Sequence, residues 1–136
     1  MNIYVIVILV FVLLTFLLAL YVFIKHVFSK KLNLDDLAYI KAHWDDILKL
    51  SEEDPVMAIM DADKILNYAL SRHGFEGSIG EKLKAAAPRF SNINHVWTAH
   101  KLRNTLAHEF VELEREQVRI TLKRFERALK DLGAKL

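Results

Sequence analysis

The sequence is most informative at residues 97–108, which read W-T-A-H-K-L-R-N-T-L-A-H. In a helix that turns about 100° per residue, one apolar stripe through this stretch consists of Val96, Ala99, Leu102, Leu106 and Phe110. Arg103 falls inside that stripe. A neighbouring stripe, about a quarter-turn away, consists of Trp97, His100, Asn104 and His108. The pattern therefore predicts an amphipathic helix that carries one charge on its apolar face.

A second charge of this kind lies upstream. In the helix predicted after Pro55, the apolar stripe consists of Val56, Ile59, Leu66 and Leu70, and Asp63 falls in its middle. A charge on a core-facing stripe is costly unless it is paired, so we expect an ion pair between Asp63 and Arg103. This pair could serve only to fix the helix register, or it could hold Arg103 so that its remaining donors face a phosphate.

The polar stripe suggests proton chemistry. His108 lies near the predicted end of its helix, where the macrodipole favours the protonated imidazole, and Asn104 is its neighbour four residues earlier. A histidine that exchanges a proton beside an arginine is suited to phosphodiester cleavage. The alternative is a solvated polar face that His108 caps. We place Trp97, His100 and Lys101 as residues that could face a substrate.

We predict neither a metal site nor a cofactor. His100 and His108 are separated by about 12 Å of helix rise, which is too far to share a metal ion. The chain has no cysteine, so disulfides, thiolate zinc sites and cysteine nucleophiles are excluded. Its net charge of +2 is too small to argue for nucleic-acid binding from bulk electrostatics alone.

The rest of the chain after residue 33 predicts an all-α fold. Capping residues and helical spacing define an antiparallel bundle of four main helices and a short extra one. The expected helices are Leu34–Leu50, which Ser51-Glu52-Glu53 interrupts; one from the Asp54-Pro55 cap to His73, stopped by Gly74; a short one between the Ser78/Glu81 capping box and Pro88; one from Ile93 to His108 or Glu109; and Glu114–Leu132, ended by Gly133.

The first 24 residues form a separate apolar segment. From Ile3 to Ile24 the only polar side chain is Thr15, and this run of about 22 residues makes about 33 Å of helix, enough to span a bilayer. A cleaved signal peptide is the rival interpretation, but the run is too long and lacks a basic start and a small-residue cleavage site. We therefore expect an N-terminal transmembrane anchor over residues 1–26, a juxtamembrane linker over 27–33 and a helical domain over 34–136.

The charges that flank this segment predict its orientation. The only charge before the span is the α-amino group, whereas Lys25, His26, Lys30 and Lys31 follow it. Basic residues favour the cytoplasmic side, so we expect a single-pass membrane protein with its N-terminus outside and its helical domain in the cytoplasm.

Residues 103–108, R-N-T-L-A-H, resemble the signature of the HEPN superfamily (higher eukaryotes and prokaryotes nucleotide-binding). That signature is an arginine, usually followed by a polar residue, with a histidine four to six positions after the arginine. Leu102 and Glu109 also fit its common form. The stretch A-D-K-I-L at residues 62–66 is similar to the acidic second helix of many such domains. The resemblance covers about residues 34–132, and the family's helical fold agrees with the predicted bundle.

The resemblance implies an RNase-like site. Many HEPN domains are metal-independent endoribonucleases of defence or stress systems, and they typically work as homodimers with facing signature helices. By this resemblance Arg103 would bind the scissile phosphate and His108 would act as acid or base. Asn104 would orient the phosphate or His108, and Asp63 would hold Arg103. In one toxin subgroup a tyrosine two positions after the histidine is modified with adenylate; Phe110 stands there instead, so that regulation is not expected.

Other HEPN domains are inactive binding modules. The alternative function is therefore a non-catalytic membrane-tethered adaptor that dimerises or recruits another protein or a nucleotide. The membrane anchor and the weak net charge favour the adaptor, whereas the complete set of Arg103, Asn104 and His108 favours an enzyme that acts on RNA. The sequence identifies neither the RNA target nor an activating signal.

Overall fold

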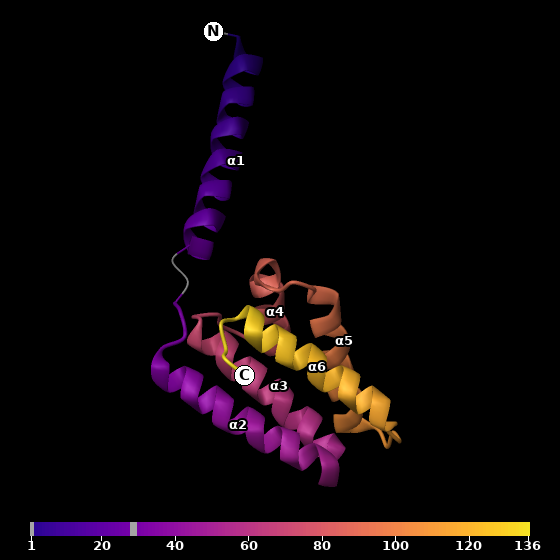
Figure 1. Cartoon of the computed structure of the whole chain (residues 1–136). Helices are drawn as coiled ribbons and strands as arrows, with labels where there is room; N and C mark the ends of the chain where they lie inside the picture. Colours follow the sequence, from indigo (N-terminus) through magenta and orange to yellow (C-terminus); the bar gives the residue numbers. More distant parts are fainter. Residues whose placement is uncertain (1, 28–29) are drawn as a thin grey trace. The chain divides into compact units, whose positions relative to one another are not determined.

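The computed structural model describes residues 2–27 and 30–136, and it divides the chain into two compact units, Met1–Lys30 and Lys31–Leu136 (Figure 1). In the first unit, helix α1 runs over Ile3–Val27. Its stretch Ile3–Lys25 is long and apolar enough to cross a membrane, and its side chains are exposed. The predicted linker, 27–33, includes residues 28 and 29, which lie outside the described residues.

The second unit is an all-helical bundle, as predicted. It contains four main helices, one short α-helix and one 3₁₀ turn: α2 Leu34–Glu53, α3 Pro55–Arg72, α4 Ile79–Ala86, η1 Ala87–Arg89, α5 Ile93–His108 and α6 Arg115–Asp131. Helix α3 lies centrally and packs against α2, α4, α5 and α6 (Figure 1). Because α5 packs against both α3 and α6, its residues can meet side chains of the central helix.

Local capping explains most helix ends. The Asp54 carboxylate accepts a hydrogen bond from the Met57 backbone at 2.9 Å, and Pro55 starts α3, as the sequence predicts. Ser78 and Glu81 form the predicted capping box of α4. After α6, Gly133 has a φ of +99°, a conformation that glycine adopts without strain. These ends depend on contacts within a few residues, so the sequence reveals them.

The predicted interruption at residues 51–53 is wrong, because α2 continues to Glu53. Its final turn stays helical since the Asp54 backbone N–H still donates to the Leu50 carbonyl at 2.7 Å. The exposed Glu52 and Glu53 side chains need no burial, so their polarity does not break the helix. The chain turns only at Pro55, whose ring disfavours a helical conformation for the residue before it.

The core fills the space around α3. Ile59, Leu66 and Leu70 of α3 are fully buried, and the predicted inner face of α6 is buried throughout, at Val118, Leu122, Phe125, Ala128, Leu129 and Leu132. On α2, Ile40, Trp44 and Ile47 are buried, whereas Leu48, which helical spacing places beside Trp44 and Ile47, is 47% exposed. Phe110 is also a correction: it lies beyond the end of α5 and is fully exposed, so it does not extend the apolar stripe.

Candidate functional site

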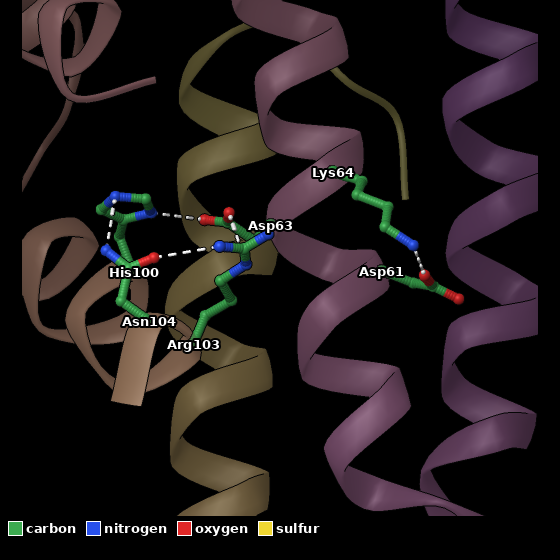
Figure 2. A network of polar contacts seen from close by, with 6 residues as sticks. All are labelled: Asp61, Asp63, Lys64, His100, Arg103 and Asn104. Atoms are coloured by element: carbon green, nitrogen blue, oxygen red, sulfur yellow. Dashed lines mark hydrogen bonds and ion pairs between the residues drawn. The ribbon is translucent and has the colours of Figure 1, made fainter. Parts of the chain in front are cut away.

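Four polar side chains from two helices form a closed network (Figure 2). Asp63 comes from α3, and His100, Arg103 and Asn104 come from α5. The rotation of α5 explains the convergence, because these three residues lie within about 100° of one another around the helix. The network therefore joins α5 to the central helix of the bundle.

The Asp63 carboxylate is 3% exposed and meets two donors. Its Oδ1 lies 2.8 Å from His100 Nδ1, and its Oδ2 lies 3.4 Å from Arg103 Nε. The predicted contact between Asp63 and Arg103 is thus present. It is an ion pair without a hydrogen bond, because the buried Nε has no hydrogen-bond partner despite this distance. The one hydrogen bond to Asp63 within the described residues comes from His100.

Asn104 closes the network. Arg103 Nη1 donates to Asn104 Oδ1 at 3.0 Å, and Asn104 Nδ2 lies 3.2 Å from His100 Nε2. The amide therefore connects the guanidinium to the imidazole. Asn104 turns toward these two residues, whereas the described residues show no bond from it to His108, its predicted neighbour.

His100 is buried, whereas the sequence placed it on an exposed stripe that could face a substrate. It is 6% exposed, and both of its ring nitrogens are engaged inside the network. Trp97 is half-buried, and its ring lies edge-on to the His100 ring with a centroid distance of 6.0 Å. It also lies over Gly80 of α4 and so helps to cover the network. Lys101 is exposed.

His108 lies outside this network. It is the last residue of α5 and is exposed, and its side chain makes no hydrogen bond or ion pair within the described residues. It follows Arg103 by five positions, which places it about 7.5 Å further along the helix and about 140° around it. Arg103 and His108 of one chain therefore point to different sides of α5.

Arg103 retains the capacity to bind an anion. Its side chain is 28% exposed, and within the described residues no hydrogen bond engages Nη2. An arginine that is partly buried against a carboxylate and open at one end can direct its free donors toward a phosphate or carboxylate oxygen. Among the described residues no group of three or more His, Asp or Glu side chains is arranged to hold a metal ion.

The sequence analysis missed the contact between His100 and Asp63. The same rotation that predicted the Asp63–Arg103 pair contained the signal, because His100 lies only about 60° from Arg103 around α5. A histidine beside a core-facing arginine can reach the same buried carboxylate. Helical spacing alone instead places His100 with Trp97, Asn104 and His108 on the polar stripe.

A second buried carboxylate was also missed. Asp36 accepts hydrogen bonds from Tyr68 Oη at 3.0 Å and from Arg72 Nε at 2.7 Å, both on α3. Burial of this carboxyl opposes its ionisation, but hydrogen bonds from the Asn33 backbone, Tyr68 and Arg72 outweigh burial, so the pKa of Asp36 lies below its ordinary value. These hydrogen bonds hold α2 against α3.

Comparison with known proteins identifies no relative of the chain. No protein-family model, no curated protein and no solved structure matches the chain. The functional argument therefore depends on the residues and on the geometry of the network.

Proposed function

We propose that residues 34–136 form a HEPN-like domain that cleaves RNA without a metal ion and acts as a homodimer. The observation that carries this proposal is the environment of the Arg103 side chain. A buried carboxylate balances its charge, an amide orients it, and 28% of its side chain remains exposed on a helix that ends in an exposed histidine. The motif R-N-x3-H on α5 and the acidic residue on the preceding main helix support the same proposal.

In this proposal each residue has one task. Arg103 binds the scissile phosphate and stabilises the negative charge that builds up on it. His108 exchanges protons: one imidazole removes the proton of the ribose 2′-hydroxyl, and a protonated imidazole donates to the leaving 5′-oxygen, which yields a cyclic phosphate. Asn104 orients the guanidinium, and Asp63 balances its charge.

The geometry of α5 favours a composite site. Because Arg103 and His108 point to different sides of one helix, a single chain does not readily bring both to one phosphate. Two copies related by a two-fold axis would bring His108 of each chain near the other's Arg103 and would supply both the acid and the base. The exposed Phe110, just past the end of α5, offers an apolar surface for such a contact.

Helix α1 gives the proposal a location. We propose that it is a retained single-span anchor and that the helical domain lies in the cytoplasm. Confinement to a bilayer raises the effective concentration of the chains, which favours the dimer that a composite site requires. A role in defence or in a stress response fits an RNase held at the membrane.

The second candidate function is a non-catalytic adaptor. The observations that favour it are the exposed Phe110 and the position of His108 outside the network, since a bundle with an open apolar end can recruit another protein. In this case Asp63 and Arg103 would fix the register of α3 and α5.

The test incubates the full chain, in detergent micelles, with mixed RNA and a metal chelator. We expect cleavage that falls by about 100-fold or more in Arg103→Ala and in His108→Ala, the usual effect of losing a charge-stabilising donor or an acid–base group. Matched controls are Arg119→Ala on α6 and His43→Ala on α2, both exposed, which should cleave like the wild type. Intact RNA with a folded, dimeric wild type would favour the adaptor.

A further inference from the structure

His100 is a buried histidine that the proposed cleavage does not use. It lies at the centre of the network, with Asp63 on one ring nitrogen and Asn104 on the other (Figure 2). Burial of a group with two polar nitrogens is costly unless both are satisfied, so the contacts constrain the state of the ring.

The hydrogen-bond inventory determines each proton in the network. Arg103 can only donate, so the atom of Asn104 that meets it is the amide oxygen. The other end of that amide is then the NH₂ group, which donates to His100 Nε2. Nε2 must therefore present a lone pair, and the ring proton lies on Nδ1, where it is donated to Asp63. Because a guanidinium can only donate, this tautomer holds whichever way the amide oxygen and nitrogen of Asn104 are assigned.

We infer that His100 is a positioning residue of the site: a neutral imidazole with its proton on Nδ1, whose Nε2 lone pair orients the Asn104 amide and, through it, Arg103. The tautomer follows from the network alone, whereas its consequence for phosphate binding rests on the proposed function. His100 itself lies too deep to touch a substrate.

The position of Arg103 depends on this arrangement. Its Nε is paired with Asp63 by charge but has no hydrogen-bond partner, so within the described residues the bond from Nη1 to Asn104 is the directional contact that aims the guanidinium. An N–H at His100 Nε2 would face the Asn104 NH₂ group. The amide would then rotate and turn its NH₂ toward Arg103, where two donors meet and the bond is lost.

The direct test is the tautomer. In the full chain labelled with ¹⁵N-histidine, in micelles near pH 7, long-range ¹H–¹⁵N spectra distinguish a protonated from an unprotonated ring nitrogen. The His100 signals are assigned by their loss in His100→Gln. We expect a protonated Nδ1 and an unprotonated Nε2. The opposite tautomer or a doubly protonated ring would overturn the inference.

Asn104→Asp gives a second, independent readout. A carboxylate at this position offers Nε2 no donor and can only accept a hydrogen bond from a ring N–H, so we expect the His100 Nε2 of this variant to take up a proton from solvent. An Nε2 that stays unprotonated in Asn104→Asp would show that residue 104 does not set the ring state, and it would overturn the inference.

Rescue separates positioning from packing. His100→Gln keeps one donor and one acceptor, whereas His100→Leu keeps the buried volume and provides neither. We expect the Arg103 Nε–H resonance to remain near its wild-type position in His100→Gln and to move toward that of a solvated arginine in His100→Leu. Equal spectra for the two variants would overturn the positioning role. Because none of these spectra requires RNA, a wild type that leaves RNA intact would refute the proposed function and not this inference.

Discussion

Asp63 shows how much one buried carboxylate can organise. It satisfies the His100 N–H and balances the Arg103 charge at the same time, from a position on α3 where the surrounding side chains are apolar. Another pair on the same helix, Asp61 with Lys64 at 2.8 Å, lies apart from this network (Figure 2) and its lysine side chain is 62% exposed. Water and salt screen the Asp61–Lys64 pair, so the two ion pairs should differ in their contribution to stability.

We therefore predict that Asp63→Asn lowers the free energy of unfolding by about 1.5–3 kcal/mol, the range for a lost hydrogen bond to a charged group. Asp61→Asn, the matched control, should cost less than about 1 kcal/mol because exposed ion pairs contribute little. The measurement is urea unfolding of the full chain in micelles, followed by tryptophan fluorescence. An Asp63→Asn variant as stable as Asp61→Asn would show that the network does not stabilise the bundle.

At the scale of elements, polar clusters position the helices that carry the site. At the end of α6, Asp131 accepts from both the backbone N–H and the hydroxyl of Ser91, each at 2.7 Å, and so holds the loop that leads into α5. Asp36 of α2 accepts hydrogen bonds from Tyr68 and Arg72 of α3 and so holds α2 against α3. Helix packing alone fixes the apolar contacts, whereas these clusters fix the position of one helix along another.

The Asp36 cluster predicts an acid-sensitive contact between α2 and α3. The pKa of Asp36 is lower in the folded chain than its ordinary value of 3.8, so the folded state holds fewer protons than the unfolded state when pH falls through this range. The stabilising effect of the ionised Asp36 carboxylate is complete at pH values above its ordinary pKa. It is lost as the pH falls through the lower pKa that Asp36 has in the folded chain. Asp36→Asn should remove this dependence.

The experiment compares urea unfolding of the wild type and Asp36→Asn from pH 6 to pH 3. The difference in the free energy of unfolding should stay constant above about pH 5 and shrink below about pH 4. Asp35→Asn is the neighbouring control and should leave the wild-type profile unchanged, since the exposed Asp35 carboxylate makes no hydrogen bond or ion pair among the described residues. A constant difference across the whole range would contradict the role of Asp36.

At the scale of the whole molecule, the chain separates an apolar helix from a charged bundle. Nearly all of α1 is apolar, whereas the bundle buries its own core and exposes charges. The basic side chains nearest the apolar run Ile3–Ile24 are Lys25, Lys30 and Lys31, which all follow it in the sequence. This asymmetry is the basis for the proposed cytoplasmic location of the bundle.

The absence of cysteine makes that orientation simple to test. Single-cysteine variants Asn2→Cys and Lys135→Cys place one thiol before α1 and one in the bundle, both at exposed positions. In intact cells, a membrane-impermeant maleimide should label Asn2→Cys at once and Lys135→Cys only after permeabilisation. The reverse pattern would contradict the proposed orientation, and a purified chain without the residue-2 thiol would show that the N-terminal segment is cleaved.

The sequence predicted each helix and most helix ends, because caps such as Asp54 and Ser78 act on backbone groups within three residues. It also determined that Asp63 and Arg103 would meet, since a charge on an apolar face requires a partner. The membrane-length character of α1 is equally a property of its composition.

Which polar residues are buried depends on how the helices pack against one another. His100 and Asn104 share a helix face with His108, yet the first two turn toward Asp63 and the third stays exposed. The exposure of Leu48 and Phe110 was likewise invisible to periodicity. The physical reason is that spacing fixes the direction of a side chain from its own helix, whereas burial depends on which neighbouring helix lies in that direction and how far it extends.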